Sequence, residues 1–175
     1  MKLSLIFLLS LNFLSIKCQN KDATELMNYI YDDILVEKNR YFVLDKSIDY
    51  TIADFELQNY QKRDLKNDDP NFPIELITDP PTDLNQTDWK KIQLPKTIFK
   101  TERELNDPSF LDKNKVFYAF STPIFSKNKK YCIITVSENY TRGSIDINYV
   151  LKKENGQWDE VLNFVVRRTK RGINY

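Results

Sequence analysis

An asparagine–glycine pair near the C-terminus, Asn155-Gly156, constrains this chain more than any other feature of its sequence. Asn-Gly is the preferred two-residue turn of a β-hairpin, because both central residues of that turn take positive φ. Apolar and polar residues alternate on both sides of the pair, over 144–152 and 157–167. The sequence therefore predicts two antiparallel strands that are joined by this turn.

The turn also implies a register for the two strands. The predicted partners are Ile145 with Val166, Ile147 with Phe164, Tyr149 with Leu162, Asn148 with Asn163, Val150 with Val161, and Lys152 with Asp159. Apolar residues then meet apolar ones and opposite charges meet, as stable cross-strand pairs require. A slip of one residue would move the whole apolar set to the other face.

Two further strands are predicted ahead of this hairpin, over 116–125 and 130–137, so that residues 115–168 form a four-stranded antiparallel meander. The 130–137 segment is apolar at both alternating sets of positions, which indicates a central strand covered by helices. Pro123 cannot donate a ladder hydrogen bond, so it predicts an edge or a bulge in the first strand.

The N-terminal half is predicted to be helical or mixed over 21–62. A helix over 22–38 has Asp22 as its cap, with Glu25 as capping-box partner, and an apolar stripe of Leu26, Ile30 and Ile34. A second helix is predicted over 48–61. A short helix over 101–107 has Thr101 and Glu104 as its capping box, and Pro108 ends it.

Residues 63–97 contain five of the seven prolines, at positions 70, 73, 80, 81 and 95. Proline disfavours helix, yet apolar residues such as Phe72 and Leu76 are frequent, so a packed loop that wraps the domain is predicted. The expected fold is α+β: one N-terminal helix, or two, packed on the C-terminal four-stranded antiparallel meander, with the long proline-containing loop between them.

The N-terminus is typical of a secretion signal over 1–17, followed by a single domain over 18–175. Leu3 to Ile16 is dominated by apolar residues. These fourteen residues span about 21 Å as a helix, which is short of the ~30 Å hydrocarbon core of a membrane. The segment before Cys18 resembles a bacterial lipoprotein signal, in which Cys18 is the acylated residue. Lys17 departs from that pattern, because the residue before the cysteine is normally small. Lipidation at Cys18 and simple secretion after cleavage both stay open.

Two stretches carry a resemblance to a known group. Phe120-Ser121-Thr122-Pro123-Ile124-Phe125-Ser126 is followed by an apolar strand and by Tyr149-Val150-Leu151-Lys152-Lys153-Glu154-Asn155-Gly156-Gln157-Trp158. Over residues 98–162 the chain resembles uncharacterised exported proteins and candidate lipoproteins of Bacteroidetes, notably of flavobacteria. Many members have a cysteine in the loop between the middle strands, whereas this chain has none there. The resemblance implies export to the periplasm, the outer membrane or the medium, and it implies no activity.

The composition excludes several chemistries. The chain has no histidine, three glycines and two cysteines, Cys18 and Cys132. A Ser-His-Asp or Cys-His system cannot be built, a zinc site lacks ligands, and no phosphate-binding glycine loop occurs. The 26 basic and 25 acidic side chains nearly cancel, so no nucleic-acid partner is expected. No catalytic residue, metal or cofactor is predicted, and the chain is not expected to be an enzyme.

Carboxylates crowd the long loop, at Asp64, Asp68, Asp69, Glu75, Asp79, Asp83 and Asp88. A solvated acidic loop is the simplest interpretation. Calcium binding and acid–base catalysis by two carboxyl groups are the alternatives.

The leading hypothesis is a non-catalytic exported or lipid-anchored domain that binds an unknown protein or another envelope component. Its membrane contact would be a lipid on Cys18. Candidate partner contacts are Tyr140 and Arg142 in the 138–143 loop and Trp89 in the 63–97 loop, because these residue types are enriched at interface hot spots. The alternatives are an immunity or inhibitor protein against an exported toxin, a carboxylate-dependent hydrolase of envelope glycans, and a pocket for a small apolar ligand.

Overall fold

One mixed β-sheet organises the chain in a computed structural model that describes residues 21–35, 40–50, 55–81, 84–92, 94–114 and 116–170. The predicted leader over 1–17 and Cys18 lie outside the described residues. The strands are β1 (Tyr41–Leu44), β2 (Thr97–Lys100), β3 (Val116–Phe120), β4 (Ile124–Phe125), β5 (Tyr131–Tyr140), β6 (Gly143–Glu154) and β7 (Gln157–Lys170). Their order in the sheet is β2-β1-β3-β5-β6-β7, and β4 pairs with β5 outside this path.

The predicted four-stranded meander with N-terminal helices is therefore wrong, because the sheet has seven strands and is mixed. β1 runs parallel to both β2 and β3, although each of these partners lies far along the chain. Parallel pairs need long crossovers, so no local turn announces them in the sequence. The strand predicted over 116–125 is two strands, β3 and β4, which lie on the two halves of β5 on either side of the Pro123 break.

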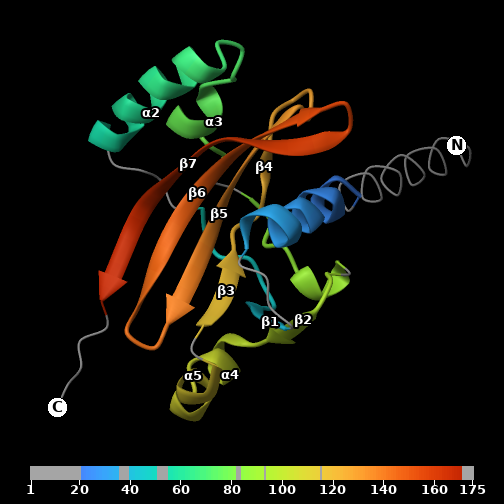
Figure 1. The fold of residues 1–175 in the computed structure, drawn as a ribbon, viewed down its shortest axis with the longest axis vertical. Helices are drawn as coiled ribbons and strands as arrows, with labels where there is room; N and C mark the ends of the chain where they lie inside the picture. Colours follow the sequence, from blue (N-terminus) through green and yellow to red (C-terminus); the bar gives the residue numbers. More distant parts are fainter. Residues whose placement is uncertain are drawn as a thin grey trace, which may run out of the picture.

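Helices are distributed along the chain rather than gathered at its start. Residues 21–29 are helical and continue into the π-helical turn η1 (Ile30–Ile34). The remaining helical elements are α2 (Phe55–Asp68), α3 (Glu75–Thr78), η2 (Trp89–Lys91), α4 (Glu102–Leu105) and α5 (Pro108–Asn114). In Figure 1, α2 and α3 lie at one end of the strands and α4 and α5 at the other.

Several local predictions change as a result. The capping box of Thr101 and Glu104 is confirmed at the start of α4, whereas Pro108 begins a new helix.

The second helix starts at Phe55 rather than near Ile48, which instead forms a bridge beside Ser121. The stretch over 63–97 therefore holds the end of α2, α3 and η2 instead of a continuous loop. The helix is already formed at Lys21, so Asp22 is no cap; its carboxylate accepts a hydrogen bond from Lys129 at 2.6 Å.

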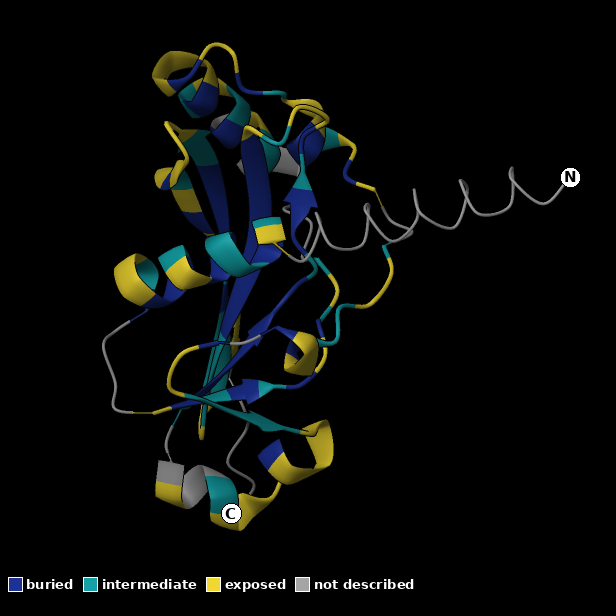
Figure 2. Ribbon diagram, turned by 90° about the vertical axis from the view of Figure 1, so that its right-hand side faces the viewer, coloured by how far each residue is buried: buried dark blue, intermediate teal, exposed yellow. Residues whose placement is uncertain are grey.

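The central strands are buried (Figure 2), and the two faces of the sheet bury separate cores. On one face the helix of residues 21–35 packs Leu26, Met27 and Ile30 against β1, β3 and β5, and all three side chains are fully buried. On the other face Leu65 of α2 packs with Ile133 and other residues of β5 to β7. A smaller cluster on this second face places Leu105 of α4 beside β1 and β3.

The Asn155-Gly156 turn forms as predicted, with positive φ of 52° and 84°, and it joins β6 to β7. The pair of Lys152 with Asp159 is confirmed. The other predicted pairs are wrong, because the ladder is irregular between Val150 and Leu151 and again between Asp146 and Ile147. The observed partners are Val150 with Leu162, Tyr149 with Asn163, Asn148 with Phe164, Ile147 with Val165 and Ile145 with Arg168.

Each irregularity is a β-bulge that inserts one residue into β7. Val161 is passed over between the partners of Leu151 and Val150, and Val166 between the partners of Ile147 and Asp146. A bulge bends and twists its strand without leaving a signature in the alternation of apolar residues. The turn therefore sets the register only for the four pairs nearest to it.

Gln61 on α2 gives a stability prediction. Its side chain is fully buried, and neither its amide nitrogen nor its carbonyl oxygen has a hydrogen-bond partner within the described part of the chain. A buried polar group without a partner costs about 1–3 kcal/mol. We expect Gln61→Leu, which keeps the side-chain size, to raise the free energy of unfolding by about 1 kcal/mol or more. Urea unfolding followed by circular dichroism measures the change.

Gln58→Leu on the same helix is the matched control, because Gln58 is only partly buried. We expect it to give no comparable gain. A loss of stability in Gln61→Leu would contradict the prediction.

Candidate functional site

An open groove of ≈ 690 Å³ lies on the second face of the sheet. One wall is the segment over 44–50 together with Gln86; α4 contributes Glu102 and Leu105, and Asn106 follows at its C-cap. The floor comes from Phe117 and Ala119 of β3, Ser137 and Asn139 of β5, Ser144 of β6 and Arg167 of β7. The groove thus occupies the part of this face between the cluster under α2 and α3 and the cluster under α4.

The floor is polar because β5 changes character along its length. Tyr131 and Ile133 point into the core beneath α2 and α3, whereas Thr135 and Ser137 are buried polar residues on the same face. Thr135 Oγ1 donates to Asn148 Oδ1 at 2.6 Å, and Asn148 Nδ2 donates to the Tyr50 hydroxyl at 3.0 Å. This network joins the floor to the 44–50 wall.

A fully buried carboxylate, Asp146, lies beside this network. Ser137 Oγ donates to Asp146 Oδ1 at 2.6 Å. Arg167 binds the other oxygen, Oδ2, through Nε at 2.6 Å and through Nη2 at 2.5 Å. Asn139 Nδ2 donates to Ser137 Oγ at 3.1 Å, so four side chains from three strands form one connected group.

The second bulge of β7 places Arg167 in this group. Beyond the first bulge, an unbroken ladder would pair Arg167 with Ile145, which shares its face of β6 with Ile147 and Tyr149 of the other core. The extra residue Val166 turns Arg167 back, so that it faces Asp146 on the floor of the groove. Bulges next to functional sites commonly re-aim a side chain in this way.

Acidic residues lie on the opposite side of the groove. Asp45 is buried, and its Oδ2 accepts a hydrogen bond from Lys90 Nζ at 2.6 Å, which raises the pKa of Lys90. Asp49 and Glu102 line the same groove and are exposed. The site therefore carries a guanidinium at the β7 side and carboxylates at the β1 side.

Known proteins offer no guide to this arrangement. No protein-family model, curated protein or solved structure matches the chain. Within the described residues, none of the helices combines the length and hydropathy that crossing a membrane requires.

The predicted partner contacts lie outside the groove. Tyr140 ends β5 and Arg142 lies in a two-residue turn, so the loop expected over 138–143 is the tip of a hairpin. Burial, and then the hydrogen bond to the Glu138 carboxylate, raise the pKa of Tyr140 to about 12. Trp89 is fully buried against Phe120, with 5.9 Å between ring centroids, so its ring is not available at the surface, and this corrects its predicted role.

The acidic residues expected in one loop are spread over several elements. Asp64 and Asp68 lie on α2, Glu75 on α3, Asp79 at its end and Asp88 at the start of η2, while Asp83 lies outside the described residues. Among the described residues, no group of three or more Asp, Glu, Cys or His side chains is arranged to hold a metal ion. Cys132 is fully buried, and burial raises the pKa of its thiol.

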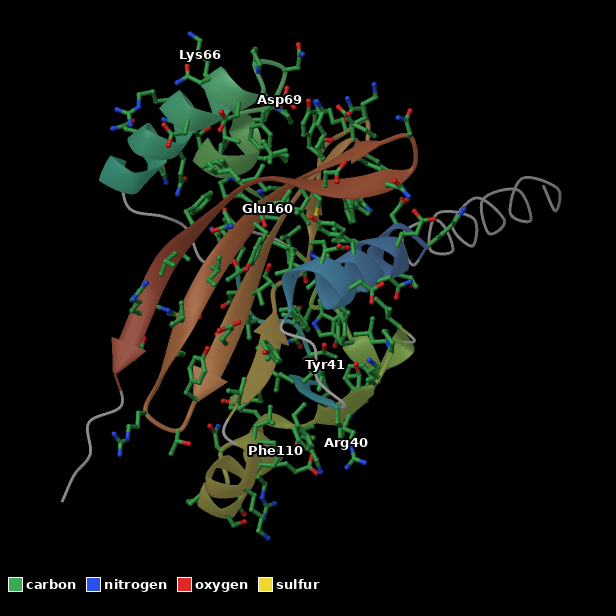
Figure 3. All side chains as sticks on the ribbon, viewed as in Figure 1. Arg40, Tyr41, Lys66, Asp69, Phe110 and Glu160 are labelled. Carbon is green, nitrogen blue, oxygen red and sulfur yellow. The ribbon has the colours of Figure 1, made fainter. Side chains whose placement is uncertain are left out.

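Asp69 departs most from the predicted solvated loop (Figure 3). It is buried at the end of α2, where it forms an ion pair with Lys152 at 2.8 Å and accepts a hydrogen bond from the Tyr131 hydroxyl at 3.0 Å. Burial acts to raise the pKa of Asp69, but the hydrogen bonds from Lys152, Tyr131 and the Asn71 amide outweigh it and hold the pKa below its usual value. Asp69 therefore joins the α2 end to β5 and β6.

The hydrogen bonds of Asp69 predict that the free energy of unfolding depends on pH. A carboxyl whose pKa is lower in the folded state stabilises the fold above its unfolded pKa of about 3.9, and this contribution is lost as the pH falls through the folded pKa. We expect Asp69→Asn to lower the free energy of unfolding by about 1–2 kcal/mol at pH 7. The difference in the free energy of unfolding between the wild type and Asp69→Asn should shrink below about pH 4. Urea unfolding at pH 7, 5 and 3 measures it.

Asp68→Asn is the control, because Asp68 is exposed on the same helix and should change stability little. A difference between the wild type and Asp69→Asn that stays constant from pH 7 to pH 3 would contradict the assignment.

The polarity of the groove floor is visible in the sequence, although neither a motif nor apolar alternation marks it. After Ile133, the positions of one face of β5 become polar, at Thr135, Ser137 and Asn139. The same face of β6 is polar at Ser144, Asp146 and Asn148. The pairing of these two sets, Thr135 with Asn148, Ser137 with Asp146 and Asn139 with Ser144, follows once the turn at Thr141-Arg142 is known.

Proposed function

We propose that this chain is a non-catalytic, exported binding domain of the bacterial envelope and that it takes a polar ligand in the groove over β3 to β7. One observation carries the proposal. A fully buried carboxylate, Asp146, holds the partly exposed guanidinium of Arg167 at the floor of an open groove, and a β-bulge aims it there.

The energetics of the Asp146–Arg167 pair support a role in binding rather than in folding. Burying a carboxylate costs several kcal/mol, and a buried ion pair is often no more stabilising than well-packed apolar residues of similar volume. Under α2 and α3 this face is mainly apolar, and the Asp69–Lys152 ion pair there joins the end of α2 to the sheet. The Asp146–Arg167 pair instead lies at the open groove with its guanidinium exposed, so it is better explained by what it can bind.

The shifted carboxyl groups support a non-catalytic role. A general acid needs a raised pKa, whereas Asp69, Glu104 and Asp107 all have lowered ones. Hydrogen bonds from Lys100 and Thr101 lower the pKa of Glu104 to about 2, and those from Ser109 lower that of Asp107. Asp146 accepts from both Ser137 and Arg167, an arrangement that fixes a guanidinium rather than one that transfers a proton.

Filling the groove tests the proposal. Ser144 lies on the floor, so Ser144→Trp would occupy the space over β6. We expect the purified wild type, immobilised and exposed to solubilised flavobacterial envelope, to retain a component that Ser144→Trp retains at least about tenfold less, since a filled site loses its contacts and excludes the ligand.

Two variants of the same size are the controls. Arg168→Trp lies on β7 next to Arg167 but pairs with Ile145, on the other face of the sheet, and should retain the component. Arg142→Trp tests the hairpin tip that the sequence favoured. If Arg142→Trp no longer retains the envelope component while Ser144→Trp retains it fully, the groove is refuted as the binding site. Near-ultraviolet circular dichroism checks that each variant is folded.

Export and anchoring are a separate part of the proposal. The apolar leader over 1–17 and the cysteine after it support acylation at Cys18. A multiply acylated N-terminus anchors a domain stably, since two or more chains give lasting membrane attachment. We expect the wild type expressed in a flavobacterium to partition into detergent, and Cys18→Ala to be found in the aqueous phase.

Mass spectrometry of the N-terminus completes this test. Unmodified Cys18 in the wild type would contradict anchoring, and an intact Met1 on protein from the cytosol would contradict export altogether. Cys132→Ala is the matched control, because the Cys132 thiol is buried within β5 and should not affect partitioning.

A further inference from the structure

We propose that the ligand of the groove is a short extended peptide, with a carboxylate on Arg167 and a cationic group against Asp49 and Glu102. This inference rests on the proposed function, and it names the chemistry of the ligand. It is carried by the donors that Arg167 keeps available, by the opposite charge across the groove and by the distance between the two.

Arg167 has donors to spare. A guanidinium carries five N–H groups in a fixed planar fork. Two of them, one on Nε and one on Nη2, bind Asp146 Oδ2. The side chain is 59% exposed, so the remaining donors can reach a ligand in the groove. A planar carboxylate can accept two parallel hydrogen bonds from such a fork, which makes it the group that fits best.

The far wall favours a positive charge. Asp49 and Glu102 are exposed and, within the described ranges, neither forms an ion pair with another side chain. Asp45 is already bound by Lys90. Lys46 lines the same wall, so Lys46, Asp49 and Glu102 together leave it with a net charge of −1. This negative charge would repel a purely anionic ligand, whereas a peptide carries a cationic amino group as well as an anionic carboxylate.

The span of the site sets the length of the peptide. Four steps in the sheet order separate β1, beneath α4, from β7. At about 4.8 Å a step this distance is roughly 19 Å. An extended peptide advances about 3.3 Å per residue, so about six residues would cross the groove.

The floor between the two charged ends suits a peptide backbone. Ser144 and Asn139 lie between Arg167 and β3; Ser144 offers a hydroxyl, and Asn139, whose Nδ2 donates to Ser137, offers its amide oxygen. Amide and hydroxyl groups bind peptide N–H and C=O groups directly, without a requirement for particular side chains. Phe117 and Ala119 supply an apolar strip for one side chain.

The test uses a pool of six-residue peptides, each with an amino-terminal lysine, mixed uncharged residues in the interior and a free carboxyl end. The same pool with an amidated carboxyl end, and one with an acetylated end and norleucine in place of lysine, are mixed with it in equal amounts. Immobilised wild-type protein is incubated with the mixture, and retained peptides are quantified by mass spectrometry. We expect the free-acid, lysine-bearing form to be enriched at least about fivefold over the amide, because a charge-assisted pair is lost with the carboxylate.

Variants assign the two ends. Arg167→Gln should abolish the preference for the free acid, and Arg167→Lys should keep part of it because the charge remains. Arg168→Gln, the neighbouring arginine on the other face, should behave as the wild type. The double variant Asp49→Asn with Glu102→Gln should lose the preference for the pool with a free amino-terminal lysine over the acetylated norleucine pool, because only the first pool is cationic at that end. The wild-type comparison of acid with amide holds even if Arg167→Gln fails to fold.

The outcomes separate this inference from the proposed function. No enrichment by the wild type, or an equal loss in the Arg167 and Arg168 variants, would overturn the peptide assignment. If the envelope component whose retention Ser144→Trp abolishes proves resistant to proteases, the groove binds something other than a peptide, and the proposed function still stands. If no envelope component depends on the groove, the proposed function itself fails.

Discussion

Strand β5 is the constraint on which the rest of the structure depends. It pairs with β6 along its whole length, while its other edge is shared between β4 and β3. Residues 131–137 are all buried, so both faces must be covered and both sets of side chains must find partners. A strand buried in this way sets the positions of its neighbours, because every backbone group left unpaired there would carry a desolvation cost. The helix of residues 21–35 covers one face, and α2 with α3 covers part of the other.

The change of polarity along β5 divides that second face into two parts. As far as Ile133 the face is apolar and is closed by α2 and α3, and from Thr135 onward it is polar and forms the floor of a groove. The buried polar groups there are bonded to one another, which is what allows them to lie in the sheet at all. One hydrogen-bonded group fixes Tyr50 and a second, beside it, fixes Arg167 at the opposite side of the floor, so these bonds set both the shape and the charge of the groove.

The bulges of β7 connect this architecture to the proposed function. The alternation on both sides of Asn155-Gly156 predicts a regular hairpin. Two inserted residues instead shift the ladder until Arg167 meets Asp146. The edge strand is also twisted and carries charged side chains near its end, features that discourage pairing with another chain. These features of β7 support the grooved face, rather than the β7 edge, as the binding surface that we propose.

Features that depend on residues a few positions apart could be predicted from the sequence alone. The Asn-Gly turn, the pairing next to it, the capping box at Thr101 and the apolar stripe of Leu26 and Ile30 are of this kind, and the structure contains them all. Folding in three dimensions set the other features: the parallel pairs of β1, the continuation of helix into the proline-containing stretch, the burial of Trp89 and Asp69, and the meeting of Arg167 with Asp146. These features join segments that are far apart or follow a bulge, and the free energy that selects them comes from packing and pairing between distant residues, which no local pattern records.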